Sequence, residues 1–180
     1  MTDDAKCLCV ISECYVDTNL AATLLDASAM NHQRGCNNVC TVMQKNFADE
    51  FAVGIIDGDK RQPTYATSFD GIASCPHLTL KKHKVRSHYI IVVSKAVEDF
   101  ILSCANESNV SLEKYGLPND MQGLKEVTKT AKSSKDSRFK RLFNDLAFSS
   151  KEMVVMKNVL AYLVSAKYHC DSAYLKRLFD

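Results

Sequence analysis

Three acidic residues have the types and spacing that could do chemistry: Glu13, Asp57 and Asp59. Asp57 and Asp59, separated by one glycine, follow the apolar segment 51–56, and Glu13 ends the apolar segment 6–13. In parallel α/β sheets, ligands bind beyond the carboxyl ends of strands. Two close carboxylates repel each other unless a cation compensates them, and Mg²⁺ binds such groups while keeping waters for a phosphate. We therefore expect these acids to hold a divalent metal ion; the alternative is an ordinary polar turn.

The elements expected to position these acids alternate between strand and helix. The apolar runs predict buried strands at 6–13, 51–56 and 88–93, and the partly alternating, basic segment 78–86 precedes the last of them. Apolar spacing predicts a helix opened by Asp17 or Thr18 as N-cap and further helices at about 39–49 and 95–104. Polar and Pro- or Gly-containing segments predict loops at 31–38 and 62–77.

This order predicts an α/β fold with a parallel-rich sheet flanked by helices. The character of the chain changes after Pro118, where helical patterns continue without a strong strand. We expect an α/β domain over residues 1–118 and a helical extension over 119–180 that packs on the same domain.

Length and composition set limits on the class of protein. The 180 residues suffice for one domain with a hydrophobic core, and 46% hydrophobic with 24% charged residues is typical of soluble proteins. The net charge of +2 gives no general attraction to nucleic acid, so a basic surface requires clustering. No apolar run spans a bilayer, and the acidic start lacks a secretory signal, which predicts a cytoplasmic protein. We expect its eight cysteines, which lack paired zinc-site spacing, to be reduced and mostly buried.

Two segments carry a family resemblance. Residues 11–17 (Ile-Ser-Glu-Cys-Tyr-Val-Asp), followed by a helix, resemble the first motif of Toprim domains. Residues 54–60 (Gly-Ile-Ile-Asp-Gly-Asp-Lys) resemble the second, a hydrophobic strand ending in Asp-x-Asp. The likeness covers about residues 6–100 and is nearest to nucleases of the overcoming-lysogenization-defect type and related phage-defence nucleases. It departs from the family at Cys14, where Gly is usual.

The resemblance implies a nuclease in which Mg²⁺ or Mn²⁺ orients a phosphate and activates a water. It assigns metal binding to Glu13, Asp57 and Asp59 with support from Asp17, and further catalytic roles to Glu98, Lys60 and Lys95. Glu98 would hold a second metal ion or act as general base, and either lysine would neutralise charge in the transition state. The pattern around Glu98 equally fits an acid in a first helical turn, where the helix dipole favours it.

Two basic clusters bear on the substrate. The first is Lys81, Lys82, Lys84 and Arg86; the second runs from Lys125 through Lys129 and Lys132 to Arg141. Both could follow a phosphate backbone, and the alternative is ordinary solvated faces. The expected partners are nucleic acid (DNA rather than RNA), a second copy of the chain and, because the sequence has no nucleotide-binding Gly-x-x-x-x-Gly-Lys-Ser/Thr loop, a separate ATPase chain. No membrane partner is expected.

Two other functions remain open. The first is a non-catalytic Toprim-like module that binds nucleic acid or a protein partner, which Cys14 favours. The second is a receiver-like domain of the response-regulator type, which would need an acidic pair near the first strand and a lone Asp after the third. In this chain the pair follows a later strand, so the receiver function ranks below the other two.

Overall fold

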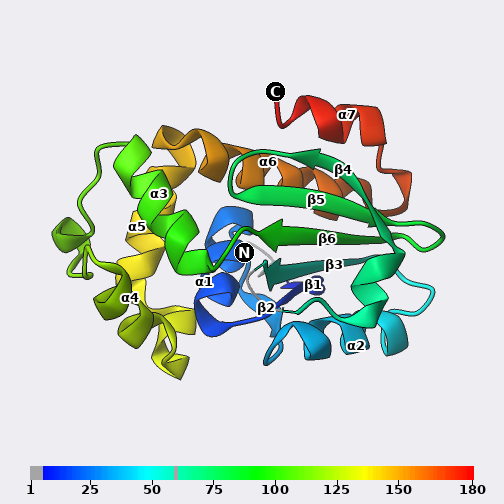
Figure 1. Ribbon diagram of the computed structural model, residues 1–180, viewed down its shortest axis with the longest axis horizontal. Helices are drawn as coiled ribbons and strands as arrows, with labels where there is room; N and C mark the ends of the chain where they lie inside the picture. Colours follow the sequence, from blue (N-terminus) through cyan, green and yellow to red (C-terminus); the bar gives the residue numbers. More distant parts are fainter. Residues whose placement is uncertain (1–5, 59–60) are drawn as a thin grey trace, which may run out of the picture.

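The computed structural model describes residues 6–58 and 61–180, and its centre is a six-stranded mixed sheet with helices on both faces (Figure 1). The strand order is β2-β1-β3-β6-β5-β4. The first four strands in this order are parallel, whereas β5 and β4 run antiparallel to their neighbours. The strands are β1 (Lys6–Ser12), β2 (Ala29–His32), β3 (Ala52–Asp57), β4 (Phe69–Ser74), β5 (Leu78–His83) and β6 (His88–Val93). The predicted α/β class is confirmed.

Helices occupy most of the remaining chain. The α-helices are α1 (Tyr15–Leu25), α2 (Cys36–Lys45), α3 (Val97–Glu107), α4 (Met121–Thr128), α5 (Ser137–Ser149), α6 (Lys151–Ala166) and α7 (Ser172–Arg177). Short 3₁₀ helices are η1 (Thr64–Ser68), η2 (Leu112–Tyr115), η3 (Ala131–Lys135) and η4 (Lys167–His169). Among the described residues, no helix is both long and apolar enough to cross a bilayer.

The central strand β3 is buried on both faces because nearly every one of its side chains is apolar. Val53 and Ile55 face the large core formed with α1, α3, α5 and α6, whereas Ile56 faces the smaller core formed with α2. The approach of α2 is so close that a Cβ on Gly54 would lie 2.8 Å from Met43 Sδ. A parallel strand covered by helices on both sides is therefore the scaffold of the molecule.

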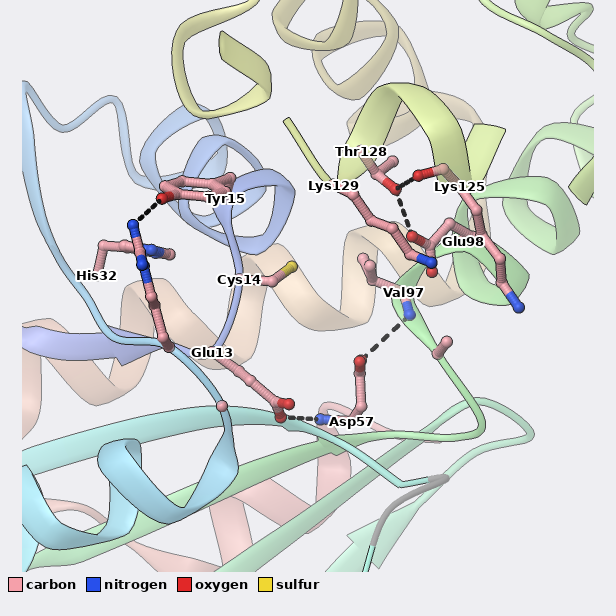
Figure 2. Close-up of a pocket in the computed structure, with 13 residues that line it drawn as sticks. Glu13, Cys14, Tyr15, His32, Asp57, Val97, Glu98, Lys125, Thr128 and Lys129 are labelled. Atoms are coloured by element: carbon pink, nitrogen blue, oxygen red, sulfur yellow. Dashed lines mark hydrogen bonds between the residues drawn. The ribbon is translucent and has the colours of Figure 1, made fainter. Parts of the chain in front are cut away.

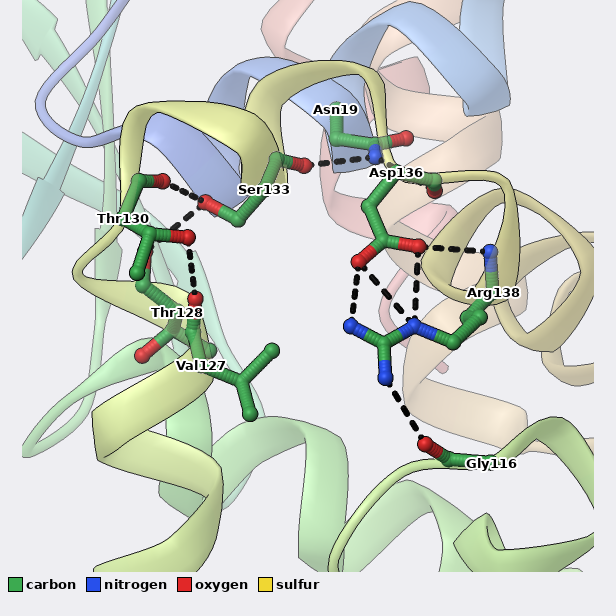
Figure 3. A network of polar contacts seen from close by, with 8 residues as sticks. All are labelled: Asn19, Gly116, Val127, Thr128, Thr130, Ser133, Asp136 and Arg138. Carbon is green, nitrogen blue, oxygen red and sulfur yellow. Dashed lines mark hydrogen bonds and ion pairs between the residues drawn. The ribbon is translucent and has the colours of Figure 1, made fainter.

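The segment 119–180 is helical and covers the same face of the sheet as α1 and α3. Apolar side chains of α5 and α6 belong to one continuous core with those of α1 and α3. Asn19 of α1 is buried, and its Nδ2 donates hydrogen bonds to the carbonyl oxygens of Ser133 (2.7 Å) and Asp136 (3.1 Å) (Figure 3). Apolar packing and polar contacts thus join the extension to the sheet.

Four expectations about local structure were wrong. The expected loop at 31–38 contains the end of β2, and the expected loop at 62–77 contains η1 and β4. The first helix begins at Tyr15, with Cys14 as its cap: the Cys14 thiol sulfur accepts a hydrogen bond from the backbone N–H of Asp17 (3.4 Å). The second helix begins at Cys36 and ends at Lys45, earlier at both ends than expected. The eight cysteines are all free thiols, as expected, but only four of them are buried and the other four are half-buried.

Candidate active site

The topology of the sheet marks one edge as a ligand site. From β1 the chain crosses through α1 to β2 on one side, and it then crosses through α2 to β3 on the other side of β1. Helix α1 packs in the larger core and α2 in the smaller one, so the two crossovers lie on opposite faces. In open α/β sheets this reversal opens a crevice beyond the carboxyl ends of the two strands. Glu13 directly follows β1 and Asp57 ends β3, which places both acids at that crevice.

Backbone contacts fix Glu13 and Asp57 against each other. The Asp57 backbone N–H donates to Glu13 Oε2 (2.8 Å), and the Glu13 N–H donates to the Ile55 carbonyl (3.1 Å). The backbone N–H of Val97, the first residue of α3, donates to Asp57 Oδ1 (3.2 Å). Glu13 is 2% exposed and Asp57 7% exposed. Two buried carboxylates are therefore held side by side, and each accepts a backbone hydrogen bond, one from β3 and one from α3 (Figure 2).

Gly58 permits this arrangement because the end of β3 comes very close to β6 at this position. Its N–H donates to the Val93 carbonyl (2.7 Å), and a Cβ at this position would lie 3.0 Å from the same oxygen. A side chain would therefore push the end of β3 away from β6.

Two further acids lie next to this pair. Glu98 stands in the first turn of α3, 7% exposed, and its Oε1 accepts a hydrogen bond from the Thr128 hydroxyl of α4. Asp17, 1% exposed, stands in the first turn of α1, where its Oδ2 accepts a hydrogen bond from the Cys14 thiol (2.9 Å). Asp17 Oδ1 is buried and finds no hydrogen-bond partner among the residues that the structure describes. The site thus gathers carboxylates from the ends of two strands and the starts of two helices.

Burial and mutual repulsion perturb this cluster. Desolvation raises the pKa of Asp17 well above its usual range, and the negative charges of Asp57, Glu13 and Glu98 raise it further. Burial, followed by the charge of Asp17, also raises the pKa of the Cys14 thiol, so that Cys14 stays a hydrogen-bond donor. Such concentrated negative potential attracts a cation or a proton.

A cavity of about 450 Å³ opens above the acids (Figure 2). Glu13, Asp57 and Glu98 line its acidic side, while Lys125 of α4 and Lys129, which caps that helix, line it from the extension. The opposite wall consists of Cys14 and Tyr15 at the start of α1 and of His32, Arg34 and Gly35 between the end of β2 and α2. A volume of this size suits a small polar ligand or one unit of a polymer.

The donor types suit a hard divalent cation, which prefers carboxylate oxygens. Asp17 Oδ1, which is buried and finds no partner within residues 6–58 and 61–180, leaves one oxygen of this cluster for a cation or a proton. Within residues 6–58 and 61–180, however, no group of three His, Cys, Asp or Glu side chains is close enough together to hold an ion. The predicted ligand Asp59 and the predicted catalytic Lys60 lie outside the described residues.

The structure brings most of the remaining predicted site residues together. Glu13, Asp57, Glu98 and Lys129 line the cavity, and Asp17 lies next to their carboxylates. Lys95 is different: it is exposed, has a backbone φ of 58°, and is not among the residues that line the cavity.

The predicted nucleic-acid contacts separate into two regions. In the pairing of β5 with β6, Lys82 lies opposite Tyr89, which is near the start of β6. The first basic cluster, Lys81, Lys82, Lys84 and Arg86, therefore lies at the amino ends of the parallel strands. This is the end of the sheet opposite the acidic cavity. The second region belongs to the helical extension, where Lys129 caps α4 and Lys132 is exposed on the following helix η3.

Sequence reasoning missed several contacts at the site. The Thr128 hydroxyl on Glu98, the Val97 N–H on Asp57 and the Tyr15–His32 ring stack (4.3 Å between centroids) all depend on tertiary packing. Three of these residues lie in segments that the sequence had marked: Tyr15 in 11–17, His32 in the polar segment 31–38, and Val97 directly before Glu98. No protein-family model matches the chain, and comparisons with curated proteins and with solved structures gave no match.

Proposed function

We propose that this chain is a Mg²⁺- or Mn²⁺-dependent nuclease that hydrolyses phosphodiester bonds in nucleic acid through a Toprim-like acidic site. One observation carries the proposal: Glu13 and Asp57, buried and joined by a hydrogen bond of 2.8 Å, lie at the reversal point of the sheet, beneath a cavity lined by lysines. Buried carboxylates facing a cation-lined opening suit a substrate that carries phosphate.

Each described residue has a defined task in this proposal. Glu13 and Asp57 supply oxygens held rigid by backbone donors, and Asp59 would complete the ligand set. A bound ion would supply charge stabilisation for the phosphate and a water of lowered pKa. Lys125 and Lys129 attract the phosphate backbone to the opening of the cavity.

Glu98 is suited to accept a proton from the attacking water, because the Thr128 hydroxyl holds one of its oxygens in place. Asp17 supports the site from behind, where its buried carboxyl group accepts the hydrogen bond of the Cys14 thiol at the start of α1. The Cys14 thiol, at the position where the Toprim motif usually has Gly, donates to Asp17 and leaves Glu13 in place.

The wider setting follows from the resemblance alone. We propose DNA rather than RNA as the substrate, an anti-phage role, a separate ATPase chain as a partner and a homodimer as the assembly. The alternative function is a non-catalytic module that binds nucleic acid or a protein. It is favoured by the lack of a three-ligand group among the described residues.

The test is nicking of supercoiled plasmid and of circular single-stranded DNA with Mg²⁺ or Mn²⁺. We expect metal-dependent cleavage by the wild type and none by Asp57→Asn, which keeps an oxygen for the Val97 N–H but removes the charge. The matched control is Asp70→Asn on the edge strand β4, whose exposed carboxylate contacts Lys84 (3.7 Å); it should cut normally.

If no variant cuts, calorimetric titration with Mn²⁺ separates the remaining cases. Binding that disappears in Asp57→Asn would keep the metal site and point to a missing partner or another substrate. No binding by the wild type would refute the metal site and support the non-catalytic module.

A further inference from the structure

A second cavity adjoins the first across a shared wall. It has a volume of about 560 Å³ and is lined by residues of α1, β2, the segment between them, η3 and α5. Tyr15 and His32 line both cavities, and their rings stack with an interplanar angle of 18°. Arg34 Nη2 donates to the Tyr15 hydroxyl (3.1 Å), which fixes the stacked pair from the side of the first cavity. The two cavities therefore lie on either side of the same aromatic pair, and we refer to this stretch of the surface, from the first cavity over the pair to the second, as the path.

Each of the two cavities carries two lysines in its lining, and the acids are confined to the bottom of the first. Lys125 and Lys129 line the first cavity, and Lys135 and Lys140 line the second. Within the described residues, none of these four lysines forms an ion pair. The rest of the second cavity is lined by small apolar residues and Met30 and by five hydroxyl or amide side chains, namely Thr18, Asn19, Thr23, Ser28 and Ser134. Lysines on both sides of the aromatic pair fit a ligand that carries a series of phosphates.

The neighbouring Arg138 differs from these four lysines, because its guanidinium group is held by partners within the fold. Asp136 accepts hydrogen bonds from Arg138 Nε and Nη2, at 3.1 and 2.7 Å, and Arg138 Nη1 donates to the Gly116 carbonyl (Figure 3). Arg138 is thus occupied within the fold. The two hydrogen bonds from Asn19 hold the backbone at Ser133 and Asp136, on both sides of Lys135. The lysines of the second cavity therefore stand on an anchored segment while their charges stay available.

We propose that this path binds a single-stranded polynucleotide, with the backbone running from Lys125 and Lys129 to Lys135 and Lys140 and a base placed against the Tyr15–His32 pair. Aromatic faces combined with a cationic track are the features that bind single strands without sequence preference. The depth of the acids favours an unpaired strand or a locally opened duplex over a closed one: Glu13 and Asp57 are 2% and 7% exposed at the bottom of the first cavity. A phosphate reaches them only on a strand that can bend into the cavity. The position of the cut rests on the proposed nuclease function, whereas binding along the path does not.

The experiment is fluorescence anisotropy with a labelled oligothymidine, an oligouridine and a DNA duplex of equal length, without divalent metal. The variant is Lys135→Gln/Lys140→Gln, and the matched control is Lys81→Gln/Lys84→Gln at the opposite end of the sheet. We expect the wild type to prefer the single strands and the first variant to bind them more weakly. The slope of log affinity against log salt should decrease by about 1.4, since each phosphate contact contributes about 0.7 for single strands. The loss of affinity should be on the order of tenfold at ~0.1 M salt.

The two single-stranded probes separate DNA from RNA as the ligand, and binding of either supports the path. Binding of neither probe by the wild type, duplex binding as tight as single-strand binding, or equal losses in both double variants would overturn the proposal. Urea unfolding of each variant checks that the substitutions leave the fold intact, so that a loss of binding reports on the removed lysine charges.

The proposed nuclease function can be refuted independently of the proposed path. If the wild type binds single strands through Lys135 and Lys140 but cuts nothing with Mg²⁺ or Mn²⁺, the path stands and the nuclease does not. If Asp57-dependent cleavage occurs and Lys135→Gln/Lys140→Gln leaves both binding and KM unchanged, the nuclease stands and the path does not.

Discussion

The hydrogen bond between Thr128 and Glu98 makes a quantitative prediction, because it joins two buried groups from distant segments. Thr128 is 2% exposed and Glu98 7% exposed, and the hydroxyl donates to Glu98 Oε1 (Figure 2). Thr128→Val keeps the shape of the side chain and removes the donor. Hydrogen bonds to charged groups contribute about 1.5–3 kcal/mol, so we expect the variant to lose about this much free energy of unfolding. For a chain of this size the melting temperature should fall by about 3–12 °C.

The assay is equilibrium unfolding in urea at neutral pH, followed by circular dichroism, with the free energy taken by linear extrapolation. The matched control is Thr130→Val, whose hydroxyl is exposed and donates to the nearby Val127 carbonyl (2.9 Å); its cost should stay within about 0.5 kcal/mol. In a Glu98→Gln background, Thr128→Val should cost only about 0.5–1.5 kcal/mol, because the remaining bond joins neutral groups. An equal cost in both backgrounds, or a cost below about 0.5 kcal/mol in the wild type, would refute the reasoning.

Two further predictions concern the scaffold and the acidic cluster. Gly54→Ala should lower the free energy of unfolding by about 1–3 kcal/mol, because the new Cβ would lie 2.8 Å from Met43 Sδ. The control is Gly71→Ala, where the new Cβ enters open space, and it should leave the free energy of unfolding nearly unchanged in the same urea assay. Similar losses in both variants would contradict the packing argument. Asp17→Asn should stabilise the metal-free protein at neutral pH. The folded-state pKa of Asp17 is raised above its unfolded value, so wild-type stability falls as pH rises from the unfolded pKa through the folded one, and the Asn variant does not share this loss. Thermal melts from about pH 4 to pH 8 should show an advantage that grows with pH, and an advantage that shrinks would show that the sign is wrong.

Burial decides which strands could be predicted from the sequence. Strands β3 and β6 are apolar at nearly every position because both of their faces are covered, and such runs are easily seen. The missed strands β2 and β4 are the two edges of the sheet. β2 has only four half-buried residues, and β4 has exposed positions at Asp70 and Gly71, so neither shows a clear pattern.

The residues of the site also divide into those that the sequence could predict and those that it could not. Glu13 and Asp57 could be predicted because each acid ends an apolar run, and the order of parallel strands then brings them together. Thr128 could not be predicted, because its role depends on how α4 packs against α3. The cap of α1 was misplaced because Ser, Thr, Asp and Asn are the preferred N-caps, whereas this helix uses the sulfur of Cys14.

The placement of α4 also bears on how far this molecule can be divided into modules. Helix α4 presents Thr128 to Glu98 and two lysines to the cavity, so the helical extension supplies part of the site that the sheet begins. A chain truncated after residue 118 would leave the apolar sides of α1 and α3 uncovered and Glu98 without its donor. The minimal unit for transplantation or fusion therefore includes the extension. Inserted sequence is better placed near Val85, a 90% exposed residue in the turn between β5 and β6, at the far end of the sheet.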